Sequence, residues 1–256
     1  MASDLRSSFA IYPMVEEYEA TGLVAGVYAE ILDAMPFVPS IFKSLAACPR
    51  YLALAWRQAA PVLGGEGFEA TADALARSVK DAAEPPPREE VRQVLGRFVG
   101  PLGRMLLLSA GLLEALEGRM TGQPADGPLP EPAPVEPAQG TPSQWDAPDY
   151  DTYGAIRAAL QTPLVNSIWR TLAAEGLLGE AWAVFGPQVA GSRTSADRLQ
   201  DDAVAAARAV EWPVLASREA MAAHGVADAA PAMASILDAY VKTLPRVLAL
   251  VASSSG

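Results

Sequence analysis

One segment of this chain occurs twice, and this duplication limits the possible folds more than any other feature. Residues 36–47 read PFVPSIFKSLAA and residues 163–174 read PLVNSIWRTLAA, with identical residues at seven of the twelve positions. A second pair follows in the same order, with VLGRFVGPLGRMLLL at 94–108 and ILDAYVKTLPRVLAL at 236–250. This second pair aligns Phe98 with Tyr240, Leu102 with Leu244 and Arg104 with Arg246. Two collinear repeats predict two homologous halves packed about a pseudo-two-fold axis, with room for a ligand between them.

The composition favours helices in both halves. Alanine, which has the highest helix propensity, makes up roughly a fifth of the chain. Apolar residues recur at spacings of three and four positions, as in Val91, Val94, Leu95 and Phe98. No alternating run of apolar and polar residues has the length of a strand. The sequence therefore predicts an all-α fold, with about four to six helices in each half.

A segment of different composition separates the halves. Residues 121–150 contain eight of the 22 prolines and five acidic residues, but no lysine or arginine. Because proline interrupts helices, we expect this segment to be extended, either as a disordered linker or as an ordered belt held by Trp145 and Tyr150. The predicted organisation is a helical repeat at 1–120, a proline-rich acidic linker at 121–150 and a second helical repeat at 151–256.

Charge and residue counts exclude several classes of function. The net charge of −11 argues against nucleic-acid binding, which requires a clustered basic face. With one cysteine, Cys48, the chain can form no internal disulfide and no cysteine zinc site. Its one histidine, His224, argues against most Ser-His and Cys-His catalytic pairs. No signal peptide and no uncharged apolar stretch of about 18 residues is evident, so we expect a cytoplasmic protein without membrane contact. We expect no metal and no cofactor, and a homodimer is one possible assembly.

Most polar and aromatic residues that stand out are better explained by structural roles. His224 is predicted to be a solvated or capping residue, and Cys48 a buried, unreactive thiol. Three aspartates are expected on a solvated helix face: Asp197, Asp201 and Asp202. Trp56 and Trp182 are expected in the core. Arg104 and Arg246 each follow a helix-breaking Gly or Pro, and they either cap a helix or bind a carboxylate.

Two proline-containing positions resemble helix starts. Thr162 followed by Pro163 is typical of a helix N-terminus, and it would leave the amides of Leu164, Val165 and Asn166 free to bind a small anion. A similar start is expected near Ser40 in the first half.

The sequence PFVPSIFKSLAACPRYLALAWRQAAPVL at 36–63 resembles the group I 2-haloacid dehalogenases. The internal duplication resembles that family too, as does the block at 94–108 followed by the proline-rich segment. The resemblance implies two tandem all-α repeats that form a pseudo-dimer with the active site between them. It also implies that a water molecule, activated by an aspartate, attacks the carbon bearing the halogen. No cofactor or covalent ester is then needed, and both enantiomers are accepted.

Transferring the family's residues one by one gives a mixed set. The serine before the family's aspartate matches Ser167, but the aspartate position is Ile168 and the family's asparagine position is Leu102. No catalytic residue is therefore assigned, because isoleucine cannot accept a proton. The predicted substrate-binding residues are Phe37, Ser40, Asn166, Ser167 and Tyr240.

Two hypotheses follow from this set. The first is a diverged family member with a small, mostly apolar cleft for a small carboxylic acid or an apolar ligand, in which the base for dehalogenation is missing. The second is an active hydrolase of 2-haloacids or other small 2-substituted carboxylic acids, whose water-activating site has been rearranged.

Overall fold

The computed structural model describes residues 14–79, 83–120 and 150–254 of the chain. Every regular element in these ranges is a helix, so the predicted all-α fold is confirmed. The alternatives for the proline-rich segment, including the role of Trp145, concern residues outside the described ranges, and Tyr150 is the first residue of a helix.

The first half of the described chain contains one short 3-10 helix and five α-helices. They are η1 (Glu17–Glu19), α2 (Gly22–Ala34), α3 (Ser40–Leu45), α4 (Pro49–Ala59), α5 (Glu66–Arg77) and α6 (Glu89–Leu116). The second half contains six α-helices, interrupted and followed by short 3-10 helices. They are α7 (Tyr150–Leu160), α8 (Ser167–Ala174), α9 (Leu178–Phe185), η3 (Gly186–Gln188), α10 (Val189–Ala209), α11 (Arg218–Ala223), η4 (Ala227–Ala229), α12 (Ala230–Val251) and η5 (Ala252–Ser254).

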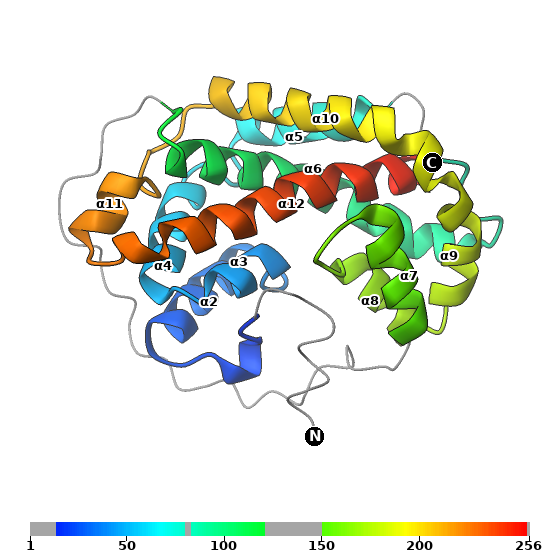
Figure 1. The fold of residues 1–256 in the computed structure, drawn as a ribbon, viewed down its shortest axis with the longest axis horizontal. Helices are drawn as coiled ribbons and strands as arrows, with labels where there is room; N and C mark the ends of the chain where they lie inside the picture. Colours follow the sequence, from blue (N-terminus) through cyan, green and yellow to red (C-terminus); the bar gives the residue numbers. More distant parts are fainter. Residues whose placement is uncertain (1–13, 80–82, 121–149, 255–256) are drawn as a thin grey trace.

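The two longest helices of the structure, α6 and α12, pack against each other in antiparallel directions at its centre (Figure 1). Helices α5 and α10 cover one side of this pair, while α2–α4 and α7–α9 form two separate groups on the other side (Figure 1). The central helices are long and rich in apolar residues, and only burial on several sides removes that surface from water. Leu106 and Leu107 of α6 and Val247 and Leu248 of α12 are accordingly inaccessible to solvent.

Helix α6 is long and apolar enough to cross a membrane when judged by length and composition alone. However, 78% of its most apolar stretch is buried against other helices of the protein. This burial is typical of the core helix of a globular protein.

Prolines lie inside both central helices without ending them. The sequence predicted that the glycine or proline before Arg104 and before Arg246 breaks a helix, and this prediction is wrong. Pro101 and Pro245 lie within continuous helices, since α6 extends to Leu116 and α12 to Val251. An interior proline removes one backbone hydrogen bond, and here the packing of the central pair offsets that loss.

Two glycines of α6 allow other segments to approach its backbone closely. A Cβ atom on Gly103 would lie 2.7 Å from the carbonyl oxygen of Ala72 in α5. A Cβ atom on Gly111 would lie 2.5–2.9 Å from three atoms of the Trp212 indole, which follows α10. These distances are shorter than van der Waals contact, so the packing of α6 against both neighbours depends on residues without a side chain.

The helix start predicted at Thr162-Pro163 is wrong, because α8 begins four residues after Pro163, at Ser167. Thr162 instead follows the end of α7, where its amide donates to the Arg157 carbonyl at 3.1 Å. Its hydroxyl accepts a hydrogen bond from the Leu164 amide at 3.1 Å and shares a second, of 2.6 Å, with the Thr243 hydroxyl of α12. The Leu164 amide is therefore not free to bind an anion. In the first half, α3 begins at Ser40 as expected.

Candidate functional site

A small cavity lies where the first turns of α3 and α8 meet the middle of the central helix pair. The volume open to the centres of water-sized molecules is about 40 Å³. Its walls are formed by Phe37, Pro39, Ser40, Ile41, Phe98, Pro101, Leu102, Met105, Asn166, Ser167, Tyr240 and Leu244. One water needs about 10–15 Å³ on this measure, so the cavity accommodates a molecule of only a few heavy atoms.

The structure brings all five predicted substrate-binding residues to this one cavity. Phe37 precedes α3 and is 42% exposed, while Ser40 is the first residue of α3. Asn166 and Ser167 come from the start of α8, and Tyr240 comes from α12. Residues more than two hundred positions apart in the sequence therefore share one wall.

The two positions expected to have lost catalytic groups are placed differently. Leu102 of α6 contributes to the cavity wall. Ile168 is fully buried but is not among the residues that line the cavity. The side chain after Ser167 is therefore part of the packed core.

The sequence did not single out six of the lining residues, which are Pro39, Ile41, Phe98, Pro101, Met105 and Leu244. All six are apolar, and the hydrophobic pattern alone assigns such residues to the core. The alignment of the repeats could have identified two of these residues as lining the cavity, since Phe98 aligns with Tyr240 and Leu244 aligns with Leu102.

No lining residue of the cavity is Asp, Glu, His, Lys, Arg or Cys, considering the part of the chain that the structure describes. Tyr240 is the one titratable group in the wall, and its hydroxyl forms a 3.0 Å hydrogen bond with the Ser44 hydroxyl. Burial raises the pKa of Tyr240 far above its ordinary value, so the phenol stays protonated at neutral pH. None of the described residues that line the cavity could therefore remove a proton from water.

The polar end of the cavity is formed by Asn166 and the start of α8. Asn166 is 6% exposed, and its side-chain nitrogen Nδ2 has no hydrogen-bond partner among the described residues. The backbone amides of Trp169 and Arg170 donate to the Asn166 carbonyl. The amides of Ser167 and Ile168 precede them in the first turn of α8, where a helix has no carbonyl of its own for the amides to donate to. Unpaired amides and the helix dipole favour negative charge at this end. The geometry can hold a carboxylate without any cationic side chain.

The nearest cations are engaged behind the cavity and do not line it. Lys43 of α3 and Arg170 of α8, which occupy aligned positions in the two repeats, both contact Glu16. The nitrogen–oxygen distances are 2.9 Å for Lys43 and 3.4 Å for Arg170, and Lys43 also lies 3.1 Å from Glu17. Burial by itself would raise the pKa of Glu16, but the two cations outweigh it and lower the pKa below its ordinary value. Glu16 therefore stays ionised, and together with Glu17 it balances the charges of the two cations.

The remaining polar candidates have structural roles. The backbone of His224 ends α11, where its amide donates to the Ala220 carbonyl and its carbonyl accepts from Arg50. Cys48 is buried at the start of α4. Asp197, Asp201 and Asp202 are exposed on α10, Trp56 is buried, and Trp182 is partly buried against the core. Within the described ranges, no cluster of three or more His, Cys, Asp or Glu residues could hold a metal ion.

The two arginines at aligned positions also differ in their contacts. Arg104 pairs with Glu69 of α5 at 2.5 Å. Arg246 donates to the carbonyls of Leu160 and Gln161 and so caps the C-terminal end of α7. Neither arginine lines the small cavity.

No family profile and no curated protein matches the chain, but several solved structures share its fold. A D-2-haloacid dehalogenase in complex with L-LA has a TM-score of 0.76 and 21% sequence identity, over 96% of each chain. A D-2-haloacid dehalogenase mutant gives a TM-score of 0.77 at 21% identity, over 96% of this chain and 95% of that one. A mutant in complex with D-2-CPA gives 0.75 at 21% identity, with the same coverage. The chain therefore shares the helical fold of these dehalogenases along almost its whole length.

Proposed function

We propose that this chain is a diverged member of the 2-haloacid dehalogenase family that binds a small carboxylic acid and does not hydrolyse its carbon–halogen bond. The observation that carries this proposal is a cavity with an unpartnered amide nitrogen, Asn166 Nδ2, at one end and no carboxylate or imidazole among its described lining residues. Support for the family comes from the shared fold and from the repeated segments at 36–47 and 163–174.

We also propose that the two halves are tandem repeats related by a pseudo-two-fold axis, with boundaries at 1–120 and 151–256 and the linker at 121–150. Helices α2 to α6 have counterparts in the same order in α7, α8, α9, α10 and α12. Four aligned pairs line the same cavity: Pro39 and Asn166, Ser40 and Ser167, Phe98 and Tyr240, Leu102 and Leu244. Such pairs meet at one place if a pseudo-two-fold axis passes through the cavity.

In this proposal, the ligand's carboxylate accepts hydrogen bonds from Asn166 Nδ2 and from the first amides of α8. Its short aliphatic part packs against Leu102, Met105 and Leu244. Hydrolysis would require a base within hydrogen-bond reach of a water molecule beside the substrate carbon. The described side chains of the wall offer neutral hydroxyls and the Asn166 amide but no base, so a bound haloacid should persist.

Incubation with each enantiomer of 2-chloropropionate tests the proposal. We expect halide release no faster than in buffer, while propionate and 2-chloropropionate both shift the Asn166 side-chain amide signal in NMR spectra. Binding without turnover would support the proposal. Protein-dependent halide release would instead establish the second hypothesis, an active hydrolase with a rearranged site. The absence of any saturable shift would refute a carboxylate site.

Substituting Asn166→Leu should weaken propionate binding without loss of stability. Losing a hydrogen bond to a charged group should cost about 10-fold to 100-fold in Kd. The free energy of unfolding should stay the same or rise, because the substitution removes a buried nitrogen that has no partner. Calorimetric titration and urea unfolding measure the two effects.

Asn166→Asp is the matched variant of similar size. It replaces the donor by a negative charge, so propionate binding should disappear, whereas a neutral alcohol of the same size should be less affected. An Asn166→Leu protein that binds propionate as tightly as the wild type would contradict the assigned donor.

A further inference from the structure

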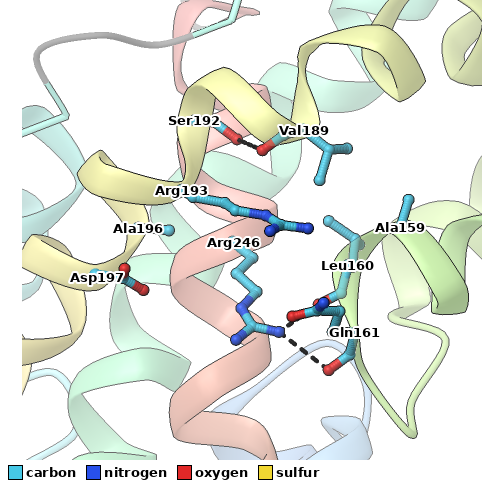
Figure 2. Close-up of a pocket in the computed structure, with 9 residues that line it drawn as sticks. All are labelled: Ala159, Leu160, Gln161, Val189, Ser192, Arg193, Ala196, Asp197 and Arg246. Carbon is cyan, nitrogen blue, oxygen red and sulfur yellow. Dashed lines mark hydrogen bonds between the residues drawn. The ribbon is translucent and has the colours of Figure 1, made fainter.

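A second, larger cavity lies away from the proposed ligand site, between the C-terminal end of α7, the start of α10 and the C-terminal half of α12 (Figure 2). Its volume on the same measure is about 210 Å³, against about 40 Å³ for the first cavity. The lining residues are Ala159, Leu160, Gln161, Val189, Ser192, Arg193, Ala196, Asp197 and Arg246. None of them lines the first cavity, so the two spaces have separate walls.

Two guanidinium groups from different helices face this cavity. Figure 2 shows Arg193 of α10 and Arg246 of α12 extending into the space beside Leu160 and Gln161. Arg193 forms no hydrogen bond or ion pair with any described residue. Asp197 is the one carboxylate in the wall, and it forms no ion pair with either arginine within the described chain. The wall therefore has an excess of positive charge in a protein whose net charge is −11.

Arg246 is held in a fixed position. Its Nη1 atom donates to the Leu160 carbonyl and, at 3.0 Å, to the Gln161 carbonyl. Its Nε and Nη2 atoms have no partner among the described residues, so this edge of the guanidinium remains available. Gln161 is the one described non-glycine residue with a positive φ, of 50°. Such a conformation is uncommon for a residue with a side chain, and here it is accompanied by the Arg246 bond to the Gln161 carbonyl and by the bond from the Thr162 amide to the Arg157 carbonyl.

The rest of the wall mixes hydrocarbon and polar groups. Ala159, Leu160, Val189 and Ala196 contribute hydrocarbon side chains, while the carbonyls of Leu160 and Gln161 face Arg246 (Figure 2). The Ser192 hydroxyl already donates to the Val189 carbonyl at 3.0 Å, so its proton is not available to a ligand. A second negative charge on the ligand would be opposed by Asp197.

We propose that this cavity binds a small organic monocarboxylate, with its carboxylate between Arg193 and Arg246. Guanidinium groups bind carboxylates through paired, charge-assisted hydrogen bonds, and two such groups from separate helices fix the position of the anion. The site does not depend on the carboxylate site at α8, since the two share no residue.

Benzoate is the probe, because its ring is too large for the first cavity but not for the second. In NMR titrations of the full chain, benzoate should shift the Nε signals of Arg193 and Arg246 with one common midpoint. The Asn166 side-chain amide signal should stay unchanged, and this readout separates the second site from the proposed function. Benzyl alcohol should not bind because it has no carboxylate, and inorganic phosphate should bind more weakly than benzoate because Asp197 opposes its second negative charge.

Arg193→Gln should weaken benzoate binding by about 10-fold or more, since it removes a charged hydrogen-bonding partner. Arg198→Gln is the matched control, because Arg198 is also exposed on α10 but faces a different hollow beside Ser78 and Leu199. It should bind benzoate as the wild type does. Unchanged binding by Arg193→Gln would overturn the proposal. So would shifts at Arg193 and Arg198 without a shift at Arg246, because these would show counter-ion binding to exposed arginines.

Discussion

Substitution of Ile168→Asp is expected to lower the free energy of unfolding by about 5–8 kcal/mol at neutral pH. Ile168 is inaccessible to solvent and lies in the apolar core beside the start of α8. The lost apolar packing costs about 2–5 kcal/mol. Burial raises the pKa of a carboxyl by about 3–5 units, and at pH 7 this raised pKa costs about 4 kcal/mol, at 1.36 kcal/mol for each pH unit above the unfolded pKa of about 3.9. The positive N-terminal end of α8 lowers this energetic cost by about 1 kcal/mol, because the new carboxylate at position 168 lies in the first turn of the helix. The remaining cost exceeds that of most single substitutions.

The neutral variant Ile168→Asn isolates the contribution of the charge. Both variants lose the same apolar packing, so they should be about equally stable below the carboxyl's unfolded pKa of about 3.9. The folded pKa is raised, so the folded state holds its proton to higher pH than the unfolded state does. As the pH rises above 4, the aspartate variant should therefore become progressively less stable than the asparagine variant. The difference should level off above the folded pKa.

Urea unfolding of the two variants between pH 4 and pH 8 measures this difference. Equal stability at pH 8 would show that a carboxylate at this position reaches water or hydrogen-bond donors. Ile168 would then belong to the wall of the small cavity, and the interpretation of the site as lacking a base position would need revision.

Substitution of Gly111→Ala is expected to lower the free energy of unfolding by about 3 kcal/mol, at the upper end for overpacking a core. The new Cβ would lie 2.5–2.9 Å from three atoms of the Trp212 indole. That ring cannot easily move, because its nitrogen donates to the Ala207 carbonyl at 2.7 Å and it packs edge-on against Phe68 at 5.8 Å. The contact joins α6 to the segment after α10, so the strain falls between the two halves of the chain.

Gly154→Ala is the control for this substitution. Gly154 lies in α7, and a Cβ there meets no atom within 4 Å. This variant should gain about 0.5–1 kcal/mol, because alanine loses less conformational freedom in a helix than glycine does. Chemical denaturation measures both changes. If Gly111→Ala were as stable as Gly154→Ala, the indole would have to occupy a different position from that in the structure.

The resemblance to the 2-haloacid dehalogenases predicted which residues would come together, because it transferred the family's pocket positions onto this sequence. Ser40 and Ser167 also occupy equivalent positions of the two repeats, and both line the cavity at the starts of α3 and α8. The larger cavity with Arg193 and Arg246 was not predicted as a site. Its walls come from three helices, and no local spacing relates Arg193 of α10 to the carbonyls at the end of α7.

By itself, the sequence determined the helical class and the residues that recur in the two halves, because helix propensity and apolar periodicity act over a few neighbouring positions. Only the tertiary structure decided where helices begin and where side chains point. Helix α8 begins at Ser167 and not at Pro163, where Thr162 bonds to Thr243 of α12, and Pro245 is buried inside a continuous α12. Likewise, Ile168 lies in the core while Asn166 faces the cavity. The direction of a side chain depends on which helices surround it, and residues far away in the chain supply those helices.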